Sequence, residues 1–449
     1  MTTISTPVIA GAKTGLPDGA WSTPRRMRAY QIAVWALAAL LFIAGEGTLG
    51  RARAAMKTIG RDSAPSIIAA QEINSALADL DANAANYLIG NAQHRAEAMA
   101  AFESRRTQAT SRLVDAAQNI TYGDAEKQPI LTMIQELGRY LELFAEARYR
   151  YDTGDVRGAT EAYRRATAIM HGKLLVAALQ LDTANRTYMD DVYADQKRAS
   201  SGAEGIAVVV GGGLVVTLLL LQIFLLRRTR RILSPPIAFA MVLALGFTGY
   251  LVHGFGAARQ DLKVAKEDAF ESIHLLWRAR AIAYDANGDE SRYLLDRQSA
   301  VIHEASYVGK VTDLTSSPDK ETPDRGLFAD ELHNVTFPGE RAAALEMTRA
   351  FRAYYKIDQQ IRKLEGTGKH DQAVQLCIGS GASESNAAFA RFDEALAKVV
   401  KINRTEFDAV IEDGDDMLRR AELFDPAFAI LIALLTWAGL RPRLKEYDA

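Results

Sequence analysis

The stretch that decides the fold covers residues 205–255 and has a basic turn at its centre. Residues 205–226 read GIAVVVGGGLVVTLLLLQIFLL without a charge, residues 227–231 read RRTRR, and residues 232–258 are again uncharged. About 20 apolar residues cross roughly 30 Å of hydrocarbon, so each arm is long enough to span a membrane. Basic loops favour the cytoplasm, so we expect a transmembrane hairpin whose turn faces inward and whose flanks begin outside.

Two further apolar segments complete the membrane plan. Residues 29–45 are uncharged and follow Arg25-Arg26-Met27-Arg28, so their amino-terminal side is expected in the cytoplasm. Residues 426–440 lie between Asp425 and a basic tail; they are short for a span, but flanking residues extend their reach. We expect a multi-pass protein of a bacterial cell membrane with both termini inside. The first segment is alternatively a signal peptide, which leaves the remaining topology unchanged.

Between these spans, apolar residues recur at steps of three and four, which is typical of one helix face. In the first long segment such faces run through residues 67–87, 99–120, 130–147 and 155–188, separated by turns rich in glycine and asparagine. Four antiparallel helices with apolar seams form an up-and-down bundle. We therefore expect such a bundle, with its first and last helices continuous with the membrane spans.

The second long segment repeats the first. Leu80-Asp81-Ala82-Asn83 recurs as Tyr284-Asp285-Ala286-Asn287, and Asn119-Ile120-Thr121 recurs as Asn334-Val335-Thr336. Thr153-Gly154 and Asn185-Arg186-Thr187 also recur in the same order, as Thr367-Gly368 and Asn403-Arg404-Thr405. Matches in one order within one layout indicate an internal duplication. A longer connection over residues 306–330 is expected in the second copy only.

The expected fold class is an all-α membrane protein with four transmembrane helices and two tandem extracytoplasmic antiparallel four-helix bundles. The expected boundaries are 1–28 for a disordered cytoplasmic tail, 29–49, 205–226, 236–256 and 425–440 for the transmembrane helices, 50–204 and 257–424 for the bundles, 227–235 for the cytoplasmic basic turn and 441–449 for the cytoplasmic tail.

Composition and motifs exclude several classes of function. The net charge is −2, and neither bundle carries a basic stripe, so no nucleic-acid partner is expected. The sole cysteine, Cys377, has no partner for an intrachain disulfide and is expected to be a small buried apolar residue. No haem-attachment, zinc-protease, phosphate-loop or nucleophile-elbow motif is present. We therefore expect no catalytic residue, no metal site and no cofactor.

Polar residues near the membrane-distal ends of the two first helices are the candidate outer site. A planar guanidinium suits a carboxylate, and exposed side chains here would meet an extracellular partner or ligand. The alternative is that the Asp and Asn side chains only bond the local backbone. The candidates are Asp81, Asn83, Asp285, Asn287, Asp289 and Arg292.

Basic residues at the expected inner ends are the candidate cytoplasmic site. No inner segment is long enough for a kinase or a signalling rod, so a signal would pass only through partners. Topology and anionic lipid also explain these charges, so docking is one of two interpretations. The candidates are Arg227, Arg228, Arg230, Arg231, Arg441, Arg443 and Lys445.

The bundles resemble the ligand-binding modules of bacterial chemoreceptors and sensor kinases. Over nearly the whole chain, the motifs Thr23-Pro24-Arg25-Arg26, the run NVTFPGER at residues 334–341 and the run GLRPRL at residues 439–444 resemble a family of actinobacterial four-span membrane proteins. In that family, the membrane protein is found beside a glutamine-binding lipoprotein and the soluble serine/threonine protein kinase G. The resemblance implies a relay of extracellular aspartate, glutamate or glutamine, captured by the lipoprotein, to the cytoplasmic kinase.

Two other functions stay open at this stage. The bundles are alternatively a receptor that binds a small ligand directly, or the protein is a structural membrane scaffold. An enzyme is not expected, since no nucleophile, base and metal set converges. A homo-oligomer is compatible with the sequence, which determines neither the ligand nor the oligomeric state.

Overall fold

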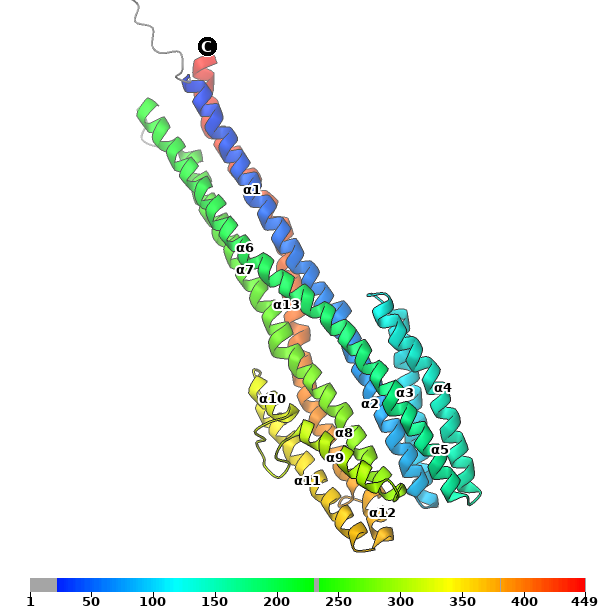
Figure 1. Ribbon diagram of the computed structural model, residues 1–449. Helices are drawn as coiled ribbons and strands as arrows, with labels where there is room; N and C mark the ends of the chain where they lie inside the picture. The colour runs from blue at the N-terminus through cyan, green and yellow to red at the C-terminus, as the bar shows by residue number, and fades with distance from the viewer. Residues whose placement is uncertain (1–21, 230–233, 380, 449) are drawn as a thin grey trace, which may run out of the picture. The chain divides into compact units, whose positions relative to one another are not determined.

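The computed structural model describes residues 22–229, 234–379 and 381–448, and every regular element in those ranges is a helix (Figure 1). Within them, four helices are long and apolar enough to cross a membrane: Thr23–Ile89, Val156–Arg228, Pro235–Leu295 and Ser385–Tyr447. Each contains one of the expected spans, and each continues into the bundle helices as predicted. Arg230, Arg231 and the expected tail residues 1–21 lie outside the described residues.

The chain divides into two compact units. The apolar unit holds residues up to Leu49, Ser201–Phe255 and residues from Arg420 onward. The bundle unit holds Gly50–Ser200 and Gly256–Arg419, so both copies of the repeated motifs belong to a single packed body. Any site formed between the two copies therefore lies inside this unit.

The first half of the chain forms the helices that the apolar periodicity predicts. Asn91 begins α3 by accepting from the backbone N–H groups of Gln93 and His94 at 3.1 Å, and Asp155 begins α5 by accepting from Gly158 at 2.9 Å. The elements are α1 (Thr23–Lys57), the π-helical segment η1 (Thr58–Ser63), α2 (Ala64–Ile89), α3 (Ala92–Gln118), α4 (Asp124–Asp152), α5 (Val156–Ile169), η2 (Met170–Leu174) and α6 (Leu175–Thr229).

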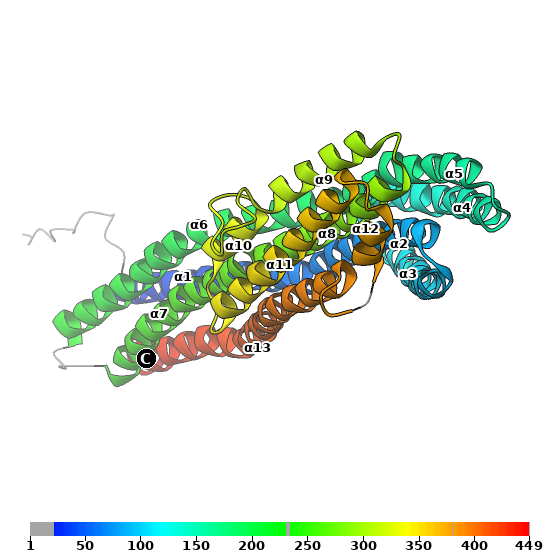
Figure 2. The same ribbon diagram turned by 90° about the horizontal axis from the view of Figure 1, so that it is seen from below.

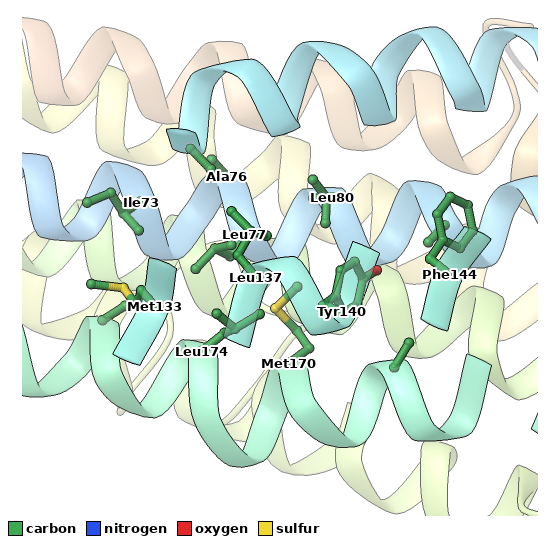
Figure 3. Packing of buried hydrophobic residues seen from close by; sticks show 14 of the residues in the cluster. Ile73, Ala76, Leu77, Leu80, Met133, Leu137, Tyr140, Phe144, Met170 and Leu174 are labelled. Atoms are coloured by element: carbon green, nitrogen blue, oxygen red, sulfur yellow. The ribbon is translucent and has the colours of Figure 1, made fainter. Parts of the chain in front are cut away.

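One hydrophobic core joins α2, α4 and the continuous helix through η2. Leu77 of α2, Leu137 of α4 and Leu174 of η2 point toward one another and are buried (Figure 3). Burying one such side chain contributes about 1.5–3 kcal/mol relative to leaving it in water. Most of the core positions belong to the apolar faces that the sequence pattern identified. At the ends of two of these faces, however, Ile120 and Tyr188 are exposed by 37% and 42%.

Among the described residues, the second half has one more α-helix than the first. The elements are α7 (Pro235–Lys263), η3 (Val264–Phe270), α8 (Glu271–Leu295), α9 (Ala300–Leu314), α10 (Leu327–Asn334), α11 (Glu340–Gly366), α12 (His370–Ile378) and α13 (Ser385–Asp448). An aromatic core lies between α10, α11 and α13, where Phe351 and Phe392 pack edge to face with centroids 5.2 Å apart. Figure 2 shows these elements from a second direction.

The expected connection over residues 306–330 is too long. Residues up to Leu314 belong to α9, and α10 begins at Leu327. The buried face of α9 extends to Leu314, because the buried residues Tyr307, Val311 and Leu314 are spaced four and three positions apart. The true connection covers residues 315–326.

A carboxylate caps the corresponding turn in each half. Glu126 accepts from the backbone N–H groups of Thr121 and Tyr122 at 2.7 and 2.6 Å. Glu340 accepts from those of Thr336 and Phe337 at 2.7 and 2.9 Å. Because both glutamates are buried, each replaces water as the acceptor for two backbone donors. The two halves thus share a turn structure as well as a motif.

The two halves meet most extensively along α2 and α8. Both helices are rich in alanine, and Ala78 of α2 is packed in the same core cluster as Ala279 and Ala283 of α8. Small side chains let two helix backbones approach closely, so polar groups on the facing surfaces are enclosed. The first of the repeated motifs, which contains Asp81 in α2 and Asp285 in α8, lies on these two helices.

Candidate functional site

Arg292 of α8 lies inside the bundle unit with only 1% of its surface exposed. Its guanidinium donates from Nη1 to Asp81 Oδ2 of α2 at 2.6 Å, and from Nη2 to Asp285 Oδ1 and Asp289 Oδ1 of α8 at 2.8 Å each. The α8 residues are spaced four and three apart, which places them on one helix face. A buried ion pair therefore links the two copies of the repeated motif.

Asp81 has further partners from the first half. The Tyr140 hydroxyl donates to Asp81 Oδ1 at 2.9 Å, and Thr167 Oγ1 donates to Oδ2 at 2.7 Å. The Tyr163 hydroxyl donates to the Asp81 backbone oxygen at 3.1 Å. Burial and the neighbouring Asp81 charge raise the pKa of Tyr140 well above its ordinary value, so Tyr140 stays a hydrogen-bond donor.

Lys310 of α9 and His171 of η2 complete the cluster. Lys310 Nζ lies 2.7 Å from Asp285 Oδ2 and 2.5 Å from Asp289 Oδ2, and His171 Nε2 lies 2.8 Å from Asp285 Oδ1. Burial opposes ionisation of Asp285, but the His171 hydrogen bond and the charges of Arg292 and Lys310 outweigh it and lower its pKa well below the ordinary value. We call Asp81, Asp285, Asp289, Arg292, Lys310 and His171 the Arg292 network.

Gly288 gives the guanidinium its space. A Cβ built at position 288 would lie 2.9 Å from Arg292 Nη1 and 3.1 Å from Nη2. Any side chain there would displace the guanidinium from its carboxylate partners. A small residue on α8 is thus part of the geometry that holds Arg292.

The expected exposure of the six outer candidates is wrong. Asp81, Asp289 and Arg292 are almost completely buried, Asn287 is 6% exposed, and Asp285 and Asn83 are partly covered. The physical reason is that α2 and α8 present these faces to each other. Asp81, Asp285, Asp289 and Arg292 come together in the Arg292 network, whereas Asn83 and Asn287 line a neighbouring cleft. Their role in binding a partner stays a prediction.

This polar cleft has a volume of about 540 Å³ and is formed by α2, α3, α8 and α13, with Ile378 at the end of α12. Asp79 pairs with Arg105 on one wall, and Asp393 accepts two bonds from Arg280 on the other, at 2.6 and 2.7 Å. The Arg105 and Arg280 guanidiniums lie 5.9 and 5.8 Å from the centroid of the Tyr284 ring. The lining residues are Asp79, Asn83, Asn86, His94, Glu97, Ala98, Ala101, Ser104, Arg105, Tyr284, Asn287, Ile378, Asn386, Phe389, Ala390, Asp393 and Glu394.

A second buried polar cluster lies between α8, α11 and the start of α13. Both carboxylate oxygens of Glu290 are buried without a hydrogen-bond partner among the described residues, as are the Tyr354 hydroxyl and Ser385 Oγ. Burial, with the nearby Asp358 charge, raises the pKa of Glu290 to about 8. Sequence reasoning missed this cluster because Glu290 stands next to Asp289 in a run that looks like a solvated charged face.

The cytoplasmic candidates that the structure describes are surface residues of the apolar unit. Arg227 and Arg228 end α6 and are exposed, as are Arg441 and Lys445 of α13, and Arg443 is half-buried. The Arg441 guanidinium lies 4.7 Å from the centroid of the Trp437 ring. Docking of a partner at these residues stays a prediction.

Comparison with known families identifies one domain. A model of the family described as "Actinobacterial sensor domain" matches residues 55–194, from the end of α1 into α6. The chain therefore contains an actinobacterial sensor domain within a helical protein that has four long apolar helices. The match includes Asp81, Tyr140 and Thr167 and ends before α7. Comparison with curated proteins gives no match, and neither does comparison with solved structures.

Proposed function

We propose that this chain is a non-enzymatic transmembrane sensor that relays an extracytoplasmic signal to a cytoplasmic partner. The proposal rests on the continuity of two helices between the matched sensor domain and the candidate membrane spans. The two helices that frame the matched sensor domain, Thr23–Ile89 and Val156–Arg228, are also two of the candidate membrane spans. Displacement of packed helices relative to each other is an established way to pass a signal along a protein.

In the finer form of this proposal, two duplicated extracytoplasmic bundles receive an amino-acid signal from a solute-binding lipoprotein and pass it to a serine/threonine kinase. The motif resemblance at residues 334–341 and 439–444 supports the partners, and the paired caps at Glu126 and Glu340 support duplication. The kinase would meet the basic inner ends. Aspartate, glutamate and glutamine are the signals that the resemblance implies.

One observation favours a second route for the signal. The polar cleft lies inside the bundle unit and joins residues of the matched sensor domain, such as Asn83 and Arg105, to residues of the second half, such as Tyr284 and Asp393. A ligand in such a cleft would touch both halves and stabilise one arrangement of them. Direct binding of a small ligand is thus the second candidate.

The test combines recovery of the kinase with a cellular response. We expect crosslinking of membranes from the native host to recover a serine/threonine kinase with the full chain, and expect less kinase with a variant carrying Arg441→Gln, Arg443→Gln and Lys445→Gln. The matched control is Arg157→Gln, because Arg157 is an exposed arginine of the bundle unit. Protease accessibility of the tail checks that the variant keeps its orientation.

Deletion of the whole chain should abolish the response of kinase-substrate phosphorylation to external amino acids. An unchanged response after deletion would overturn the relay. Equal kinase recovery from the parent and the triple variant would remove the basic tail from the docking surface.

A further inference from the structure

A second pocket of the bundle unit, with a volume of about 450 Å³, lies between α1, η1 and α13. Its floor is apolar, because Met56 and Ile411 line it and are buried. A Cβ built at Gly60 would lie 2.6 Å from Ile411 Cγ2, and one built at Gly414 would lie 2.6 Å from Met56 Cε. The two walls therefore approach each other closely at the floor, and their spacing is fixed by packing.

The lining of this pocket holds four cationic side chains and one carboxylate. Arg53, Lys57 and Arg61 follow one another at steps of four along α1 and η1, so they share one helix face. Asp415 Oδ1 lies 3.1 Å from Arg53 Nε. Asp415 Oδ2 lies 3.4 Å from Arg61 Nη2 and 3.6 Å from Arg419 Nη2. We call the pocket with these five residues the basic pocket.

The basic pocket carries more positive than negative charge. Asp415 balances a single one of the four cations, and no other carboxylate belongs to the lining. Like charges four residues apart on a helix repel each other, and a bound anion would relieve that repulsion. The side chains of Arg61 and Arg419 are 61% and 62% exposed, so an anion can reach them from solvent. Three further carboxylates of α13 stand close in sequence but outside the lining: Glu412, Asp413 and Asp416.

Both walls of the basic pocket follow directly on the apolar unit along their helices. Leu49 is the last residue of the apolar unit in α1, and Arg420 is its first residue in α13. At 1.5 Å per residue, Arg53 stands about 6 Å along α1 from Leu49, and Arg419 is next to Arg420. The polar headgroups occupy about 5–7 Å on each side of the hydrocarbon, and long basic side chains extend toward them. With the apolar helices in a membrane, these cations are therefore at the level of the lipid phosphates.

A phosphate group matches the donors of the pocket. Guanidinium groups form paired hydrogen bonds with phosphate oxygens, and a lysine adds a point charge. The apolar floor at Met56 and Ile411 suits the glycerol and the first methylene groups of a lipid better than the water shell of a free ion. The floor and the position along the helices thus both favour a lipid as the source of the phosphate.

We propose that the basic pocket binds the phosphate group of an anionic phospholipid and thereby links α1 to α13 where the two helices leave the membrane. This inference goes beyond the relay proposed above and does not rest on it. The occupant is the lipid of the adjacent leaflet, and inorganic phosphate is the alternative source that the test separates from it.

The test counts lipids bound to the purified full chain, released from neutral detergent micelles into a native mass spectrometer. The probes are dioctanoyl phosphatidylglycerol, which is anionic, dioctanoyl phosphatidylcholine, which is zwitterionic, and inorganic phosphate as a competitor. We expect the tightest phosphatidylglycerol to bind about tenfold or more tightly than phosphatidylcholine, because each basic residue near the headgroup adds attraction. We expect inorganic phosphate to displace it only at a concentration about a hundredfold higher than that of the lipid.

Three variants locate the binding. Lys57→Gln/Arg61→Gln should weaken the tightest phosphatidylglycerol about tenfold or more. The matched control is Lys197→Gln/Arg198→Gln, which removes the same two residue types at side chains that are 56% and 77% exposed. These two residues stand just before Ser201, where α6 enters the apolar unit, so the control loses less than about twofold unless attraction is diffuse.

Asp415→Asn changes the affinity in the opposite direction. It removes the one carboxylate of the lining, so phosphatidylglycerol should bind about fivefold more tightly, which corresponds to about 1 kcal/mol. A residue with a purely structural role would not give tighter binding when it is replaced. Circular dichroism of each variant without lipid checks the fold, and Asp415→Asn keeps the test decisive if the double variant unfolds.

The proposal falls if phosphatidylcholine binds as tightly as phosphatidylglycerol, if Lys57→Gln/Arg61→Gln binds like its matched control, or if Asp415→Asn weakens binding. Displacement by inorganic phosphate at a concentration equal to that of the lipid would assign the pocket to a soluble phosphate and overturn the lipid as its occupant.

Discussion

Replacement of Arg292 by methionine tests the Arg292 network most directly. Methionine is long, unbranched and apolar, so it fills much of the same space without the charge. Lys310 and His171 remain beside Asp285 and Asp289, but Asp81 forms no other ion pair among the described residues. In the variant, the Asp81 carboxylate keeps only the hydrogen bonds from the hydroxyl groups of Tyr140 and Thr167. Breaking a buried pair by removing one partner costs about 3–5 kcal/mol, and we expect Arg292→Met to lose that much stability at pH 7.

The pH dependence of this loss follows from the direction of the Asp285 shift. A carboxyl whose pKa is lowered by folding contributes stability above its unfolded pKa, and the contribution disappears as the pH falls through the folded pKa. Removing Arg292 takes away one of the charges that lower it. The difference between parent and variant should therefore be largest near neutral pH and shrink in acid below about pH 4.

The assay is urea unfolding of the full chain in detergent micelles, followed by circular dichroism. The control is Arg157→Met, because Arg157 pairs with Glu161 and both side chains are exposed, by 87% and 57%. We expect the control to lose about 1 kcal/mol or less. The double variant Arg292→Met/Asp81→Asn should be more stable than Arg292→Met alone, since the stranded charge is gone. A loss below about 1 kcal/mol for Arg292→Met, or no recovery in the double variant, would refute this account of the network.

Three further substitutions test buried carboxyl groups. Because the pKa of Glu290 is raised from 4.5 to about 8, the folded chain holds a proton that the unfolded chain releases between these values, so stability falls as pH rises through that window. Glu290→Gln should therefore be more stable than the parent at pH 8, by about 4 kcal/mol, and should not be more stable at pH 4. Equal melting curves at pH 8 would contradict the buried, unpartnered carboxyl. Glu340→Ala should lower the free energy of unfolding by about 2 kcal/mol or more, because Glu340 accepts from two backbone N–H groups and from Asn403 Nδ2 at 2.6 Å. Glu126→Ala loses only the two backbone hydrogen bonds, so its melting temperature should be higher than that of Glu340→Ala.

The long helices and their inner faces were predictable from the sequence, whereas the placement of the polar motifs was not. Apolar residues such as Leu77, Leu137 and Phe351 have no alternative to burial, so their spacing determines the helix faces. Within the sequence of its own half, each of Asp81 and Arg292 has the pattern of a surface residue. Their burial depends on the packing of α2 against α8, which are more than 200 residues apart in the chain. Glu290 was missed for the same reason, since its enclosure depends on α11 and α13.

The Arg292 network sets the register of α2 and α8 more than it adds stability. A buried ion pair contributes little beyond an apolar contact of equal size, but leaving one member unpaired costs several kcal/mol. Sliding α2 along α8 by one turn, about 5.4 Å, would break the 2.6 Å contact between Asp81 and Arg292. Sliding is therefore disfavoured. A relay through these helices would need a second arrangement in which Asp81 pairs with another cation, and the change would then be a step between two arrangements. To drive such a step from 1:99 to 99:1, a ligand or partner must favour the second arrangement by about 5.5 kcal/mol. A ligand in the polar cleft would contact both halves and is therefore one candidate for that input.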